Sequence, residues 1–164
     1  MSDQDELISA VGVDYTRLRD LLANGQWQEA DRETSAVMLK VADQEKEGWL
    51  DTGNIENFPC EDLRTIDQLW VKYSDGCFGF SVQKRIYEQE LNIYYKLAER
   101  IGWTSRTSYA YRDYNSLTFD LGCPEGQLPA WIFWGQRISI HRGSRRLSFI
   151  IHALLWHRAR NCNL

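Results

Sequence analysis

Residues 54–84, NIENFPCEDLRTIDQLWVKYSDGCFGFSVQK, place a loop, a helix and a turn in close succession. Pro59 disfavours the helical region for the residue before it, so Phe58 belongs to a loop. Apolar residues then recur at helical spacing over 61–73, which predicts a helix with one apolar face. The Ser-Asp-Gly at 74–76 supplies the turn chemistry that ends this helix. From the residues alone, the stretch is either a core helix with flanking loops or part of a site that leaves Phe58 exposed.

The same periodicity predicts helices on both sides of this stretch, and Asp14 is placed to cap the first of them. The only strand-like run, 131–133, is too short to build a sheet, so the predicted fold class is all-α. The further predicted helices cover 15–23, 26–45, 81–102 with a break near 90–92 left open, and 144–160.

Two long segments, 48–60 and 103–130, lack helical periodicity and are rich in aromatic residues and proline. Long irregular loops are uncommon in compact domains and are often functional, and a floppy linker would be rich in Ser and Gly instead. We therefore expect a compact helical domain over 14–164, after a loose leader at 1–13, whose two loops form a cupped apolar ligand surface. The alternative is that the aromatic side chains of these loops plug the ends of the helical bundle.

The bulk composition favours a globular protein inside the cell. The chain has 164 residues, of which 43% are hydrophobic, enough for one domain with a working core. No apolar run reaches the ~18 residues that a membrane span needs, and the acidic first residues are unlike a secretory leader. The four cysteines form no CxxC pair, so we expect buried or partly buried thiols rather than a zinc site.

Charge is distributed unevenly along the chain. Residues 1–125 hold all 23 acidic residues, whereas 126–164 hold six arginines, no acid and all three histidines. This pattern predicts either a face for an anionic partner or a basic tail that packs against the acidic body. An amphipathic last helix ending in arginines also fits a peripheral membrane contact, while the acidic remainder argues against nucleic acid.

Catalytic and metal-binding signatures are missing from the sequence. It has no glycine-rich phosphate loop and no GxSxG elbow. Glu61 and Asp62 are adjacent and point to different faces, so helix capping suits them better than acid/base chemistry. His152 and His157 lie roughly 140° apart around a helix axis and cannot share a metal ion well. We expect no catalytic residues and no metal site.

The opening stretch, together with motifs on both sides of it, resembles the tetrapyrrole-binding domain of the genomes-uncoupled-four family. The shared motifs follow the family's order and begin at Tyr15. One departure is Gln127, where the family commonly has histidine, so no imidazole is available there to hold a metal. The matching motifs lie at 15–22, 27–42, 47–50, 57–63, 78–83, 102–103, 117–121 and 124–129.

The resemblance implies a non-enzymatic protein that binds protoporphyrin IX or Mg-protoporphyrin IX. It further implies stimulation of magnesium chelatase, through its large subunit, in chlorophyll biosynthesis. The corresponding location is the cytoplasm or the plastid stroma, with peripheral contact to photosynthetic membranes left open. The alternative is a protein-interaction or signalling module that keeps the fold, with a bilin or another tetrapyrrole as its ligand. An enzyme acting on tetrapyrroles is the weakest reading, because no acid/base set can be assembled.

For a porphyrin, the two loops and the arginines that follow them would supply the site. Apolar side chains would cover the macrocycle at ~25 cal/mol per Å², and arginines would pair with its propionates. Arg145 and Arg146 could instead face solvent, lipid or the chelatase. The expected ligand-binding residues are Leu50, Ile55, Phe58, Pro59, Tyr111, Asn115, Phe119, Leu128, Arg137 and Arg142.

Overall fold

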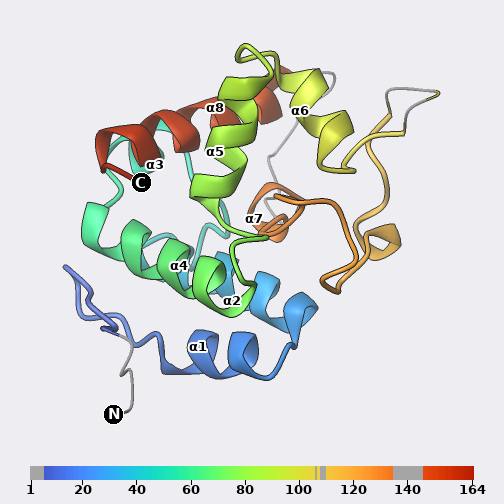
Figure 1. Ribbon diagram of the computed structural model, residues 1–164. Helices are drawn as coiled ribbons and strands as arrows, with labels where there is room; N and C mark the ends of the chain where they lie inside the picture. Colours follow the sequence, from blue (N-terminus) through green and yellow to red (C-terminus); the bar gives the residue numbers. More distant parts are fainter. Residues whose placement is uncertain (1–5, 106, 108–109, 135–145) are drawn as a thin grey trace.

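The computed structural model describes residues 6–105, 107, 110–134 and 146–164. In this part of the chain the regular structure is helical, which confirms the all-α class, and one isolated antiparallel bridge joins Thr104 to Tyr111 (Figure 1). No helix of the described residues has both the length and the apolar character needed to cross a bilayer. The elements are α1 (Thr16–Ala23), α2 (Trp27–Val41), α3 (Thr52–Glu56), α4 (Cys60–Tyr73), α5 (Phe80–Gln89), α6 (Tyr94–Arg100), the 3₁₀ turn η1 (Tyr114–Ser116), α7 (Trp131–Trp134) and α8 (Arg146–Asn161).

The helices form two groups joined by α7. Helix α1 packs on both α2 and α4 at one end of the molecule, and α5 packs on α6 and α8 at the other. Figure 1 shows α7 between these groups, where it contacts α2. The C-terminal helix α8 also contacts the short helix α3, so segments far apart in sequence meet there.

Helix α4, predicted from the opening stretch, lies in the core. Its apolar face, including Leu63, Ile66 and Trp70, is completely buried. The Trp70 ring stacks on Trp27 at 6.2 Å, and its indole N–H donates to the Thr34 hydroxyl at 2.8 Å. The helix begins one residue before the predicted start, and its central position explains why its spacing is so regular.

The segment at 6–13 is not the loose leader that the sequence suggests. Asp62 of α4 is completely buried and accepts hydrogen bonds from the Ser9 hydroxyl and from the Ala10 backbone N–H. The Tyr15 hydroxyl donates to the same carboxylate at 2.7 Å. Asp62 therefore fastens the N-terminal segment to α4. The sequence had suggested only helix capping for Glu61 and Asp62, and it gave no sign of this long-range role.

Two expectations about local structure are corrected. The run 131–133, which looks strand-like, is the helix α7. The segment 48–60, expected to be irregular throughout, contains α3, whose start is a capping box between Asp51 and Asn54. The predicted helix over 81–102 is interrupted, at the place where a break was left open. Leu91 and Asn92 adopt positive φ values of 56° and 59°, and these separate α5 from α6.

Two of the four cysteines form a disulfide, so the expectation that all four are thiols is wrong. Cys60 at the start of α4 forms a disulfide with Cys162 beyond the end of α8, with 5.2 Å between their Cα atoms. The two positions are 102 residues apart, so only the tertiary fold brings them together. Cys77 and Cys123 are free, and burial raises the pKa of the Cys123 thiol to about 12.

Candidate functional site

Four of the expected ligand-binding side chains belong to the hydrophobic core. Leu50, Ile55, Phe58 and Leu128 are each at most 1% exposed, so the expectation that the loops leave them uncovered is wrong. Helix α3, which contains Ile55, packs on α8, and the Phe58 carbonyl just beyond it accepts a hydrogen bond from Arg158 of α8 at 2.9 Å. In this conformation none of the four can offer a face to a ligand.

The other expected residues divide into two sets. Tyr111 is 38% exposed, Asn115 is exposed, and Phe119 and Pro59 are half-buried. The Asn115 side-chain oxygen accepts from the Gln28 amide at 3.4 Å, which ties the loop to α2. The expected arginines, Arg137 and Arg142, lie outside the described residues, as does Arg145.

Tyr111 and Phe119 are linked through a continuous run of rings. Tyr111 meets Trp134 of α7 edge-on at 5.8 Å between centroids, and Trp134 lies 6.4 Å from Tyr114. Tyr114 in turn packs on Phe119 at 5.1 Å and on Trp131 at 4.5 Å. The structure thus brings two of the expected residues into one aromatic surface on the long loop and α7.

A second layer of rings supports this surface from beneath. Trp103 contacts Trp134 at 5.0 Å and Phe133 at 5.1 Å, and Phe133 stacks on His152 of α8 at 3.8 Å. His152 is 1% exposed and also packs on Tyr94 of α6 at 5.0 Å. We call the following set the aromatic cluster: Tyr94, Trp103, Tyr111, Tyr114, Phe119, Trp131, Phe133, Trp134, His152 and Trp156. Tyr87 of α5 adjoins it, with its ring 4.8 Å from that of Trp156. 

Most residues of the cluster were not predicted as site residues from the sequence, although the aromatic-rich composition of segment 103–130 pointed to some of them. Trp103, Trp131 and Trp134 stand within or directly after the aromatic-rich segment 103–130. Tyr94 and His152 lie in helices whose sequences show no sign of a site, and only tertiary packing brings them to the cluster.

The outer edge of the cluster carries two coupled phenols. The Tyr111 hydroxyl donates to the Tyr94 hydroxyl at 2.6 Å. Burial raises the pKa of Tyr111 to about 12 and the pKa of Tyr94 well above its ordinary value. Both phenols are therefore neutral near pH 7 and act as hydrogen-bonding groups rather than as bases. Such an edge suits a flat, largely apolar ligand with few polar atoms.

Asp31 of α2 holds the cluster in place. Its buried carboxylate accepts from the Ala130 N–H at 2.7 Å, the Trp131 N–H at 2.9 Å and the Tyr114 hydroxyl at 2.9 Å. Burial raises the pKa of Asp31 and these three donors partly offset the rise; the resulting pKa is about 6, so most of the carboxylate is ionised at pH 7. The Arg32 guanidinium lies 5.4 Å from the Trp131 ring centroid and covers the same junction. Asp31 thereby fixes the start of α7 and the loop against each other.

Gln127, the residue that departs from the family pattern, faces the interior. It is completely buried; its amide donates to the Ile101 carbonyl at 3.1 Å and accepts from the Thr118 N–H at 3.2 Å. The Trp103 indole donates to its backbone carbonyl at 2.8 Å. The position is therefore structural, and it helps to fix the loop that carries the cluster. In the described part of the chain, no three His, Cys, Asp or Glu side chains gather in a way that could hold a metal ion.

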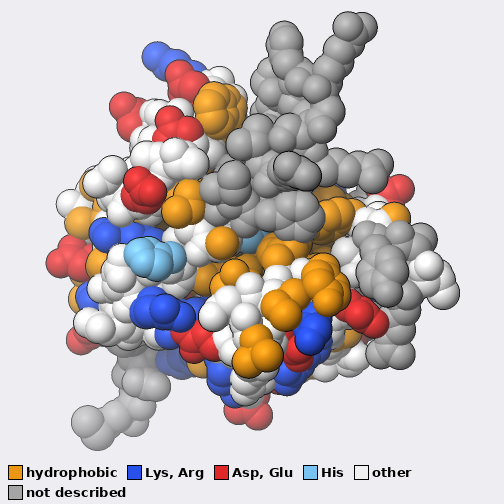
Figure 2. Space-filling view, turned by 90° about the horizontal axis from the view of Figure 1, so that it is seen from above, with side chains coloured by type: hydrophobic (Ala, Val, Ile, Leu, Met, Phe, Trp, Pro, Cys, Tyr) orange, Lys and Arg blue, Asp and Glu red, His pale blue; other side chains and the backbone are white. Residues whose placement is uncertain are grey.

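A groove of about 410 Å³ between α5 and α8 adjoins the cluster through Trp156. Tyr87, Ala153 and Leu154 give it an apolar floor, with Lys84 and Arg160 on its rim. Figure 2 shows hydrophobic side chains gathered on the face of the molecule where α5, α6 and α8 lie. This volume falls within the range of small-molecule sites.

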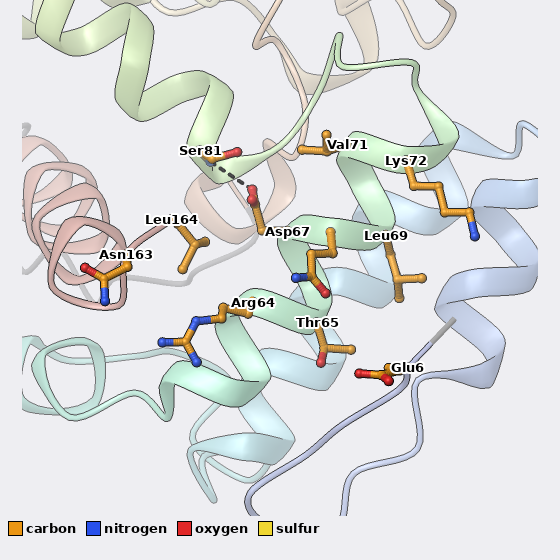
Figure 3. Close-up of a pocket in the computed structure, with 11 residues that line it drawn as sticks. Glu6, Arg64, Thr65, Asp67, Leu69, Val71, Lys72, Ser81, Asn163 and Leu164 are labelled. Carbon is orange, nitrogen blue, oxygen red and sulfur yellow. Dashed lines mark hydrogen bonds between the residues drawn. The ribbon is translucent and has the colours of Figure 1, made fainter. Parts of the chain in front are cut away.

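Two other hollows are lined by polar and apolar residues together. One of about 690 Å³ runs along α4, where both acidic and basic side chains line it (Figure 3). The other, about 470 Å³, lies beside α3 and is bordered by Asp51, Asn54 and Asn57 as well as by Val41, Ala42, Gly53, Phe58 and Pro59. Neither offers the apolar, aromatic walls found at the α6–α8 end.

The basic tail packs in part against the acidic body, one of the two arrangements that its charge predicts. Arg160 pairs with Glu88 of α5 at 2.7 Å, and Arg158 binds the Phe58 carbonyl. These two arginines are engaged within the fold.

Known proteins share this architecture. Residues 8–144 match the model of the GUN4-like family. The chain is 37% identical over 125 residues to a Ycf53-like protein of Synechocystis sp., covering 75% of this chain and 53% of that protein. It is 30% identical over 122 residues to the tetrapyrrole-binding protein, chloroplastic, of Arabidopsis thaliana, covering 68% and 46%. The chain thus spans about half the length of the curated relatives it matches.

Solved structures agree with these matches. The structure of GUN4 from Chlamydomonas reinhardtii superposes with a TM-score of 0.74 at 31% identity, covering 92% of both chains. The ligand-free structure of Arabidopsis thaliana GUN4 gives a TM-score of 0.69 at 24% identity, covering 87% of this chain and 95% of that one, and shows the common fold.

Proposed function

Because the chain belongs to the GUN4-like family, we propose that it binds a porphyrin and performs no bond chemistry on it. The resemblance read from the sequence is confirmed at the level of the family. A relative 30% identical to the chain is named a tetrapyrrole-binding protein, which supports the same class of ligand here. The preferred ligands are protoporphyrin IX and its magnesium complex.

The exposed edge of the aromatic cluster is the observation that carries this proposal. Tyr111 is 38% exposed and Trp134 beside it is half-buried, and Asp31 and Gln127 hold the supporting segments in place. A preorganised flat apolar surface binds a planar macrocycle with little loss of side-chain entropy. The residues present therefore fit a porphyrin face, although at a different surface from the one expected around Phe58.

Arginines that follow this edge in the sequence would orient the ligand. The segment 135–145 directly follows Trp134 in the chain and contains Arg137 and Arg142. We propose that these two guanidinium groups pair with the propionates of the porphyrin, because guanidinium binds carboxylate in a bidentate manner.

The biological role that we propose is delivery of the porphyrin to magnesium chelatase and stimulation of that enzyme. An assay of magnesium insertion by a purified chelatase tests this step, with and without the protein. An increased rate with the wild-type chain, lost in a variant that no longer binds porphyrin, is the expected result. An unchanged rate would remove the chelatase from the proposal while leaving porphyrin binding intact.

A porphyrin titration tests the site itself. Saturable quenching of tryptophan fluorescence is expected for the wild-type chain, and Trp134→Ala should weaken the affinity about tenfold, since a lost aromatic contact is worth about 1.4 kcal/mol. Tyr95→Ala is the matched control, because Tyr95 is an exposed aromatic residue (54%) next to Tyr94 that is not part of the cluster. Equal affinities of the two variants would place the ligand elsewhere.

The alternative is a protein-interaction module with the same fold, with or without a bilin. No saturation by either porphyrin, together with saturation by a linear bilin or a stable complex with another protein, would favour it.

A further inference from the structure

The Cys60–Cys162 disulfide closes the junction between the start of α4 and the end of α8. Two non-covalent contacts hold the same junction. The Arg158 guanidinium donates to the Phe58 carbonyl at 2.9 Å, and the Arg64 guanidinium donates to the Cys162 carbonyl at 3.0 Å. Neither contact involves a sulfur atom, so both remain available to hold the helices together when the disulfide is cleaved.

The two cysteines differ in their exposure to solvent. Cys162 is completely buried, whereas Cys60 is half-buried. Thiol–disulfide exchange requires a thiolate to reach one sulfur atom, and Cys60 is the cysteine nearer to solvent, so we take its sulfur as the point of attack. The hollow along α4 comes close to this junction, since Arg64, Asn163 and Leu164 line it (Figure 3).

We propose that this disulfide is a redox modification site, opened by a dithiol in the folded protein, and that its state controls the affinity of the aromatic cluster for its ligand. One thiolate of the dithiol attacks the Cys60 sulfur, and Cys162 leaves and takes up a proton. The second thiol then displaces Cys60, which is also protonated. The dithiol becomes a disulfide, losing two electrons and two protons, and the protein gains two thiols.

Helix α8 connects the disulfide to the ligand site. It carries His152 and Trp156, two members of the aromatic cluster, and lies against both α3 and α5. Removing a cross-link between positions 102 residues apart widens the range of arrangements open to the chain, which loosens the C-terminal end of α8. A looser α8 supports the rings of Trp103 and Phe133 less firmly. This part of the inference rests on the proposed function.

The other two cysteines supply a matched control. Cys77 and Cys123 are free, and burial raises the pKa of both thiols, so neither is a ready nucleophile near pH 7. A Cys77→Ser/Cys123→Ser variant keeps the disulfide, and a Cys60→Ser/Cys162→Ser variant removes it.

Counting thiols tests the modification site without any ligand. The native protein is incubated with or without dithiothreitol and freed of the reductant while still folded; it is then denatured, alkylated with a maleimide and weighed by mass spectrometry. Two labels without the reductant and four with it are expected. Four labels without the reductant, or two labels after treatment of the folded protein, would overturn the proposal.

Thermal unfolding tests the structural effect of the disulfide. Reduction should lower the Tm of the wild-type protein and of Cys77→Ser/Cys123→Ser by roughly 5–15 °C. The Tm of Cys60→Ser/Cys162→Ser should already be low and should not respond to dithiothreitol. A response in that variant would mean that the effect does not come from this disulfide.

Porphyrin titration of the oxidised and reduced protein tests the coupling. We expect the reduced form to bind at least about fivefold more weakly, a coupling of ordinary size for linked sites. Equal affinities would overturn the coupling but leave the proposed function standing. Failure of both forms to bind would overturn the proposed function and with it the coupling, while the thiol count and Tm still decide whether the disulfide is a modification site.

Discussion

At the scale of single residues, buried polar side chains fix how segments distant in sequence are arranged around the apolar core. Asp31, Asp62 and Gln127 are each completely buried, and each binds backbone groups from segments distant in sequence. A buried polar group without partners would be costly, so each side chain selects one arrangement of the segments around it.

Asp31 should give the protein a characteristic dependence of stability on pH. Its pKa is about 6 in the folded chain against an ordinary 3.8, so the folded chain holds this proton more tightly than the unfolded chain. The resulting stabilisation is present below about pH 4 and is lost as the pH rises through 6, by about 3 kcal/mol in total. Urea unfolding between pH 4 and 7 measures it, with Asp31→Asn for comparison. The difference in free energy of unfolding between wild type and variant should fall over this range, and parallel curves would contradict the assignment.

Gln127 should matter for stability and not for a metal. Gln127→Ala leaves the Ile101 carbonyl and the Thr118 N–H without their partner, which should reduce the free energy of unfolding by about 2–4 kcal/mol. Gln89→Ala, at an exposed position at the end of α5, is the control and should change it by less than about 0.5 kcal/mol. Similar unfolding midpoints for the two variants would show that the amide has no structural role.

At the scale of elements, side chains from other helices hold the ends of helices in place. At the start of α5, the Ser81 N–H donates a hydrogen bond of 2.8 Å to the carboxylate of Asp67, which belongs to α4 (Figure 3). Gly79 makes this approach possible, with φ at 139° and its backbone close to Asp67 and Val71.

Gly79→Ala should therefore destabilise the protein by about 2–4 kcal/mol, measured by chemical unfolding. A Cβ atom there would lie 2.8 Å from the Asp67 Oδ1 atom and 2.9 Å from the Val71 Cγ2 atom. Gly76→Ala separates the two causes, because Gly76 has φ at 80° but no atom within 4 Å of a Cβ, so only about 1 kcal/mol is expected. Equal losses would mean that the crowding at Gly79 contributes nothing.

The elements also show how far the sequence could lead. Helices α1 and α4 were predicted nearly to their ends because a periodic apolar face reports directly on the core they pack against. Helix α7 was missed because four residues are too few to show a helical periodicity. Its start is also fixed by the Asp31 carboxylate, which lies about 100 positions earlier and accepts from the Trp131 N–H. Phe58 was expected to be exposed because nothing local shows that α8 covers it. Composition indicated an aromatic surface in the long loop, but its members on α6 and α8 follow only from tertiary packing.

At the scale of the whole molecule, the N-terminal segment and the aromatic cluster are held by different side chains in different parts of the fold. Asp62 fastens the segment beside α1 and α4, whereas the cluster lies among α6, α7 and α8 (Figure 1). The stability that the N-terminal segment provides and ligand binding at the cluster should therefore be separable by mutation.

Deletion of residues 1–13 is the test of this separation. It removes two donors to Asp62 and the packing of Val13, and should lower the free energy of unfolding by about 2–4 kcal/mol. Ser9→Ala, which removes a single hydroxyl, should lower it by about 1 kcal/mol. Porphyrin affinity, measured well below the Tm, should stay within about twofold in both variants. A large loss of affinity would mean that attachment of the N-terminal segment and ligand binding at the aromatic cluster are coupled.

The partners of Asp31 have a consequence for how the protein is made. Its carboxylate lies in α2, yet the N–H groups that it binds belong to residues 99 and 100 positions later. The nascent chain therefore carries this carboxylate without its native partners while these intervening residues are made, and native packing of α2 waits until α7 has emerged. A stalled, shortened chain that ends before Ala130 should remain a client of chaperones, however regular its early helices are.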